Sequence, residues 1–156
     1  MAFIPKFQTE TDIAVVADMI NLPHEDYPRR VSSTESMIRI LIKQIESRDR
    51  PNSFHAFDIK TIHGVIMSDL PSKYRGTWRT VNVMVGPHSP PPPYLIESEI
   101  TESGIFPVNI KSDLVEWYRK FQVIHPFYDG NGRVGGIVVA VLSYFQNDGK
   151  MLAPLQ

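Results

Sequence analysis

The sequence predicts a mainly α-helical domain that carries one small β-hairpin flap. Most of the chain consists of segments whose apolar residues recur every three to four positions, the spacing of one helix face. Residues 80–85 instead alternate polar and apolar side chains, a period of two that is typical of a strand. Four consecutive prolines at 90–93 follow soon after, so this strand is not expected to belong to a large sheet. The length of 156 residues suits a single domain spanning residues 1–156.

The composition is typical of a globular protein and gives no sign of a nucleic-acid or membrane partner. Lys and Arg number 16, Asp and Glu number 17, and the net charge of −1 lacks the basic excess of a nucleic-acid binder. There is no cysteine, which excludes disulfides, cysteine-ligated zinc and thiol catalysis. No apolar run reaches membrane-spanning length, and the first residues lack the pattern of a secretory signal. We therefore expect a cytoplasmic protein; leaderless export to a host cell is compatible with the same sequence.

Two short helices are marked by signals at their ends. The first is expected to begin at Thr11 or Asp12, either of which can cap it, and to end before Pro23. The second is expected over residues 94–106, with its end near Gly104.

Two further helices are expected between them. Residues 21–31 are polar, contain two prolines and are expected to form a connector. The next helix then starts with Ser32-x-x-Glu35, which has the spacing of a capping box. Another helix follows over residues 53–70, and its inward side chains are expected to be Phe54, Phe57, Ile62, Ile66 and Leu70.

Two longer helices are expected on either side of residues 125–133. Residues 111–124 place large apolar side chains at helical spacing. The valine-rich run that ends at Gln146 would also suit a buried strand. Because Asn131 and Gly132 provide a helix start and the run is long, we expect a helix.

The segment between these helices, His-Pro-Phe-Tyr-Asp-Gly-Asn-Gly-Arg at residues 125–133, combines the groups that phosphoryl transfer needs. Glycines at a helix start let backbone N–H groups face an anion, and the helix adds its partial positive charge. Arg133 can bind a phosphate through two donors, and Asp129 offers Mg²⁺ a carboxylate. His125 can take a proton from a hydroxyl group. Each residue alone has a structural explanation, such as a turn or a cap, but their occurrence together favours a catalytic site.

Residues 125–133 resemble the signature of the Fic family, His-Pro-Phe-x-Asp/Glu-Gly-Asn-Gly-Arg. The resemblance extends upstream to Gly76-x-x-Arg79 and to the flap, and it is strongest over about residues 50–150. It implies a Fic-type helical bundle with a small β-hairpin flap over the active site. It also implies transfer of AMP from ATP to a Ser, Thr or Tyr hydroxyl of a target protein.

The resemblance assigns roles to individual residues. His125 would deprotonate the target hydroxyl, and Asp129 would bind Mg²⁺. The flap near Val81–Val85 would pair with an extended segment of the target protein. The side chain of Asn131 would contact the α-phosphate, where negative charge builds up. The donor phosphates would be held by four consecutive residues, namely Gly130, Asn131, Gly132 and Arg133.

The sequence departs from the family pattern at Gly136, where an arginine associated with the γ-phosphate is usual. A glycine here indicates either a close approach of another element or a damaged site. Glu35 raises a linked question, because it either closes the capping box or belongs to a degenerate form of the family's inhibitory helix. Two alternative functions therefore stay open. One is a Fic enzyme that transfers UMP, phosphocholine or phosphate, and the other is a catalytically impaired nucleotide- or partner-binding protein.

Overall fold

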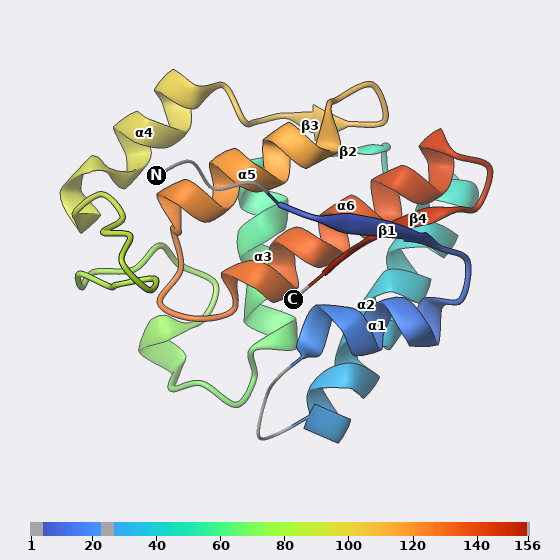
Figure 1. Ribbon diagram of the computed structural model, residues 1–156, viewed down its shortest axis with the longest axis horizontal. Coiled ribbons are helices and arrows are strands. Elements are labelled where there is room, and N and C mark those ends of the chain that lie inside the picture. The colour runs from blue at the N-terminus through green and yellow to red at the C-terminus, as the bar shows by residue number, and fades with distance from the viewer. Residues whose placement is uncertain (1–4, 23–26, 156) are drawn as a thin grey trace.

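The computed structural model, shown in Figure 1, describes residues 5–22 and 27–155. Helices dominate it. The α-helices within those ranges are α1 (Ile13–Asn21), α2 (Tyr27–Glu46), α3 (Ala56–Ile66), α4 (Ile96–Ser103), α5 (Leu114–Ile124) and α6 (Asn131–Gln146). Two single turns of 3-10 helix, Ser72–Tyr74 and Pro93–Leu95, lie in the connections that follow α3 and precede α4.

Helix α6 forms the centre of the molecule, with α5 on one side and α1 and α2 on the other (Figure 1). Its residues from Asn131 to Ser143 are all buried except Gly132. A helix that is surrounded on every side is apolar on every side, which explains why its valines show no amphipathic pattern. The sequence-based prediction of a helix rather than a strand is therefore confirmed.

Two adjacent glycines let neighbouring helices approach α6 closely. A Cβ atom at Gly135 would lie 2.9 Å from the side-chain nitrogen of Gln122 on α5. A Cβ atom at Gly136 would lie 2.9 Å from the Ile20 side chain on α1. Of the two interpretations of Gly136, close approach is the one that the packing supports.

Helix α2 begins earlier than expected, and the expected capping box is wrong. It starts at Tyr27, so Ser32 lies inside the helix and cannot be its cap. The physical reason is Pro28, which occupies the second helical position, where no backbone N–H is needed. The Glu35 carboxylate instead lies 3.7 Å from the Arg39 guanidinium on the same helix face. Of the expected connector at 21–31, residues 23–26 lie outside the described residues.

Two small antiparallel sheets join segments that are distant in the sequence, and neither was expected. Strand β1 (Phe7–Glu10) pairs with β4 (Met151–Pro154), so the two ends of the described chain lie side by side (Figure 1). Strand β2 (Ser53–Phe54) pairs with β3 (Val108–Asn109). Such pairs are too short and too distant in sequence to leave a periodic signal.

The flap is smaller than the sequence predicts. Its hairpin consists of one antiparallel bridge, in which the N–H of each of Val85 and His88 donates to the carbonyl of the other at 2.9 Å. Residues 81–84 form no strand ladder with any described part of the chain. The expected strand therefore exists only as an open, unpaired segment. Within the described residues, no helix combines the length and apolar character needed to cross a membrane.

Candidate active site

The loop that joins α5 to α6 carries the candidate site. Helix α5 ends at Ile124, and His125 adopts a left-handed conformation with φ 52°. Its N–H still donates to the Phe121 carbonyl at 2.9 Å and closes the last turn. Pro126 disfavours helical geometry in the residue before it, so the end of α5 is where the sequence predicts it.

The imidazole of His125 is suited to accept a proton. Its Nδ1 atom is buried and has no hydrogen-bond partner among the described residues. Burial lowers the pKa of His125 to about 4, and the positive charge of Arg79 acts in the same direction. His125 is therefore neutral near neutral pH, which is the state a general base requires.

Arg79 connects His125 to the flap. Its Nε atom donates to the His125 carbonyl at 2.7 Å, and its Nη atoms donate to the carbonyls of Val81 at 3.0 Å and Pro91 at 2.6 Å. Its backbone N–H donates to the Pro126 carbonyl at 2.8 Å. One buried guanidinium thus satisfies carbonyl groups at the end of α5 and in both arms of the flap.

His63, on α3, packs against the loop and bonds to its backbone. Its ring is fully buried and stacks on Phe127, with the ring centroids 3.9 Å apart. The Gly76 N–H donates to Nδ1 at 3.0 Å, so Nε2 carries the proton and donates to the Asp129 carbonyl at 2.8 Å. Sequence analysis assigned no role to His63 in the site. The structure shows that it bridges α3, the Gly76 turn and the loop.

The side chain of Asn131 is occupied by the loop backbone. Its Oδ1 atom accepts the Phe127 N–H at 2.9 Å, and its Nδ2 atom donates to the Phe127 carbonyl at 3.0 Å. These two bonds fix the loop and use one of the two N–H donors of Nδ2. Contact of this side chain with a phosphate, through the second N–H, stays a prediction.

The start of α6 presents the expected anion cradle. Gly130 has φ 88°, and a Cβ atom there would lie 2.7 Å from the sulfur of Met67. The first intrahelical bond runs from the Val134 N–H to the Gly130 carbonyl. The N–H groups of Asn131, Gly132 and Arg133 therefore have no acceptor within the helix, which leaves them available to an anion.

Arg133 lies beside this cradle in an unusual state. Its side chain is only 2% exposed, yet neither Nη atom has a hydrogen-bond partner among the described residues. One Nη atom lies 3.6 Å from Oδ2 of Asp129, beyond hydrogen-bond distance. Burial and the charge of Arg30 lower the pKa of Arg133. Burying a guanidinium without hydrogen-bond partners costs free energy, so an anion that accepts bonds from Arg133 would stabilise this arrangement.

Asp129 is the expected ligand for a metal ion. Its side chain is 47% exposed, and Oδ1 accepts the Gly130 N–H at 2.8 Å. No group of three or more His, Asp or Glu residues arranged to hold a metal occurs in the described chain. The residues present fit Mg²⁺ only in the form in which one carboxylate and the phosphates of a bound substrate share the ion.

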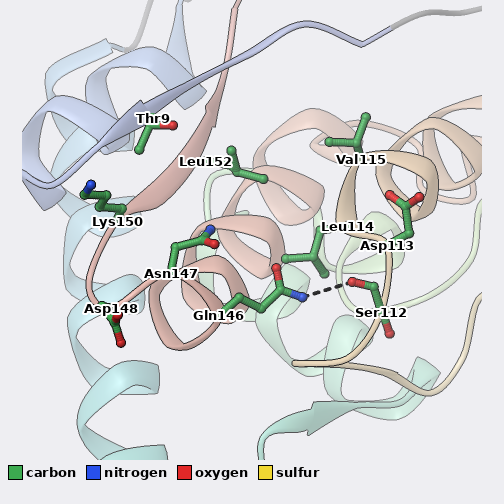
Figure 2. A pocket seen from close by; sticks show the side chains of 10 residues that line it. All are labelled: Thr9, Ser112, Asp113, Leu114, Val115, Gln146, Asn147, Asp148, Lys150 and Leu152. Atoms are coloured by element: carbon green, nitrogen blue, oxygen red, sulfur yellow. Dashed lines mark hydrogen bonds between the residues drawn. The ribbon is translucent and has the colours of Figure 1, made fainter.

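A pocket of about 730 Å³ lies at the C-terminal end of α6, away from the signature loop (Figure 2). The side chain of Gln146 donates to the carbonyls of Ile110 and Ser112, which joins the end of α6 to the segment before α5. The charged residues in its lining are Asp113, Asp148 and Lys150, so the pocket carries both signs of charge. Its walls contain none of the residues of the loop between α5 and α6.

The fold and this loop define a helical domain with a phosphate-binding helix start beside a neutral histidine. Residues 53–143 match the sequence profile of the Fic/DOC family. The chain belongs to the Fic/DOC family, and the expected family membership and fold class are confirmed.

Comparison with individual proteins agrees with this assignment. A protein of Aquifex aeolicus named "probable protein adenylyltransferase" is 37% identical over 82 residues, which cover 42% of this chain and 26% of that relative. A Fic-domain signaling protein of Bacteroides thetaiotaomicron has a similar structure, with a TM-score of 0.50, 19% identity and coverage of 76% of this chain and 48% of that one. A Fic family protein of Desulfovibrio desulfuricans is also similar, with a TM-score of 0.52 and 21% identity. The similarity covers 85% of this chain and 42% of that one. The chain therefore spans half or less of the length of these relatives.

Proposed function

We propose that this protein transfers AMP from ATP to a hydroxyl side chain of a target protein. The observation that carries the proposal is the buried Arg133, whose two Nη atoms lie beside the open N–H groups of a helix start and have no acceptor in the part of the chain that the structure describes. The neutral His125 lies at the other end of the same loop. Family membership and the name of the Aquifex relative support the choice of adenylyl transfer.

In the proposed reaction the target hydroxyl gives its proton to His125. Its oxygen forms a bond to the α-phosphorus of ATP, while the bond from that phosphorus to the bridging oxygen of pyrophosphate breaks. Pyrophosphate leaves with the electron pair of that bond. The N–H groups at the start of α6 stabilise negative charge on the α-phosphate. Asp129 would hold Mg²⁺ together with the phosphates, and the ion would neutralise charge on the leaving group.

The proposal includes a docking site for the target along the flap. Val81 is 39% exposed and Met84 is 65% exposed, and the backbone between them has no ladder partner in the described chain. An extended peptide can pair with such a segment through backbone hydrogen bonds. Arg79 bonds the carbonyls of Val81 and His125, so a peptide on the flap would be anchored beside the proposed base.

The decisive experiment supplies four donors separately. The purified protein is incubated with cell lysate and ATP, UTP, GTP or CTP labelled at the α-phosphate, and labelled proteins are separated on a gel. We expect labelling with ATP, and we expect His125→Ala to slow it by at least about 10²-fold, the usual scale for loss of a general base. If only UTP, GTP or CTP labels proteins, the transferred group is the corresponding nucleoside monophosphate and the proposal of AMP transfer is wrong. Equal labelling by His125→Ala would remove His125 as the base.

A further inference from the structure

A second arginine, Arg30, is near enough to Arg133 for its charge to lower the pKa of the Arg133 guanidinium. It belongs to the first turns of α2, a helix that packs against both α3 and α6 (Figure 1). Its side chain is 16% exposed, and one Nη atom lies 2.9 Å from Oδ2 of Asp69, just beyond the end of α3. Arg30 therefore comes to the site from a part of the chain that the signature loop does not include.

Asp69 connects the two arginines electrostatically. Burial acts to raise the pKa of Asp69, but the hydrogen bond from Arg30 and the charges of Arg30 and Arg133 outweigh it, so the pKa is lowered. Asp69 is therefore ionised at neutral pH. Its carboxylate accepts a hydrogen bond from the Arg30 guanidinium and fixes the position of that group.

Arg30 and Arg133 also repel each other. After burial, the charge of Arg30 is the next largest cause that lowers the pKa of Arg133. Both Nη atoms of Arg133 are buried and lack a hydrogen-bond partner among the described residues. Two neighbouring guanidinium groups that repel each other would be stabilised by one anion within reach of both, and a phosphate group accepts hydrogen bonds from several donors at once.

We propose that Arg30 joins Arg133 in binding the distal phosphates of the donor. This proposal rests on the proposed function, because it assigns a ligand to the same site. Helix α2 thereby contributes directly to donor selection through Arg30. The competing explanation is structural, with Arg30 serving only to join α2 to α3 through Asp69.

The neighbouring arginine provides a matched control. Arg29 contacts the same carboxylate oxygen of Asp69 at 3.7 Å, but its side chain is 65% exposed. Arg30→Gln and Arg29→Gln remove the same charge from adjacent positions of one helix. A general effect of lost positive charge would affect both variants, whereas a direct phosphate contact would affect only Arg30→Gln.

The experiment measures binding of ATP, ADP and AMP to the wild type and both variants by calorimetry in the presence of Mg²⁺. We expect the wild type to bind ATP at least about tenfold more tightly than AMP, the scale of one charge-assisted contact. Arg30→Gln should lose most of that preference, with Arg133 retaining the rest, while its affinity for AMP stays the same. Arg29→Gln should retain the preference. Thermal unfolding of each variant verifies that it is folded, and Arg30→Lys, which keeps the charge, should retain part of the preference.

Three results would overturn the proposal: no preference for ATP in the wild type, an equal loss of ATP and AMP binding in Arg30→Gln, or equal effects of Arg29→Gln and Arg30→Gln. If Arg30→Gln does not fold, full ATP preference in Arg30→Ala or none in Arg30→Lys would have the same consequence. Failure of the proposed function looks different. A wild type that binds ATP through Arg30 but transfers no AMP would contradict the transferase and leave the phosphate contact in place.

Discussion

At the scale of single residues, the state of His125 is set by burial and by Arg79. Because its pKa is lowered to about 4, His125 should remain an unprotonated base well below pH 6.5. We expect the acid limb of the transfer rate to have its midpoint near pH 4, and NMR titration of the His125 ring should give the same value. A midpoint near pH 6.5 would show that the imidazole is solvated in the working enzyme.

The same lowered pKa makes stability depend on pH. The folded state lowers the pKa of His125 below its unfolded value, so in the window between about 4 and 6.5 the unfolded chain binds more protons. The contribution of this group is present above pH 6.5 and is lost as the pH falls toward 4. The free energy of unfolding of His125→Asn should decline less steeply over that window than that of the wild type.

Asp129 should affect nucleotide binding differently with and without metal. Asp129→Asn retains an oxygen that can accept the Gly130 N–H but removes the charge that Mg²⁺ requires. It also removes a negative charge 3.6 Å from Arg133. We expect weaker ATP binding with Mg²⁺ and unchanged or tighter binding without it, measured by calorimetry. Equal losses in both conditions would exclude Asp129 as the metal ligand.

His63 offers a test by rescue. His63→Leu would leave the Gly76 N–H and the Asp129 carbonyl without their partners, at a cost of about 1–3 kcal/mol for each buried group. His63→Gln has one acceptor and one donor and should recover much of the loss in both unfolding free energy and ATP affinity. If glutamine does no better than leucine, the stacking on Phe127 is the main contribution of His63.

At the scale of elements, the two glycines of α6 have different surroundings. Gly136→Ala would place a methyl group 2.9 Å from Ile20, and such overpacking typically costs about 1–3 kcal/mol. Gly132→Ala is the control, because nothing lies within 4 Å of its added Cβ. Denaturant unfolding should show Gly136→Ala destabilised and Gly132→Ala neutral or slightly stabilised, since alanine favours helix. Combining Gly136→Ala with Ile20→Val should recover part of the loss.

The open segment of the flap can be tested by removing one backbone donor. Val83→Pro deletes an N–H that an incoming strand could use, whereas Val83→Ala shortens the side chain and keeps the N–H. If targets dock by strand addition, Val83→Pro should raise the KM for the target and leave ATP binding unchanged, and Val83→Ala should have a smaller effect. Equal labelling of targets by Val83→Pro and the wild type would place docking elsewhere.

The sequence predicted helix ends correctly where a residue at that end, such as a cap or a glycine, determines it. Asp12 caps α1 as expected, and Gly104 ends α4 in a left-handed conformation, where the end was expected. The start of α2 was missed because Pro28 was interpreted as a breaker although it lies in a first turn. The two sheets were missed because their strands pair with segments about 140 residues away in one sheet and about 55 in the other, and such partners leave no local pattern.

At the scale of the whole molecule, the site combines a predictable loop with supports that only the fold reveals. The signature residues His125, Asp129 and Arg133 lie together, as the sequence predicted. The supports from elsewhere, Arg30 and Arg79, depend on how α2 and the flap pack around α6. Among these, Arg79 alone had a sequence signal, its spacing from Gly76.

The bonds of Arg79 also imply how the two substrates influence each other. The same guanidinium holds both arms of the flap and the carbonyl of His125, so motion of the flap is transmitted to the loop. A target that orders the flap would reduce the conformational entropy of the loop before ATP arrives, and the second ligand would then lose less on binding. We expect target and donor to bind with positive cooperativity and little change of shape. Reciprocity requires that each increase the affinity of the other by the same factor.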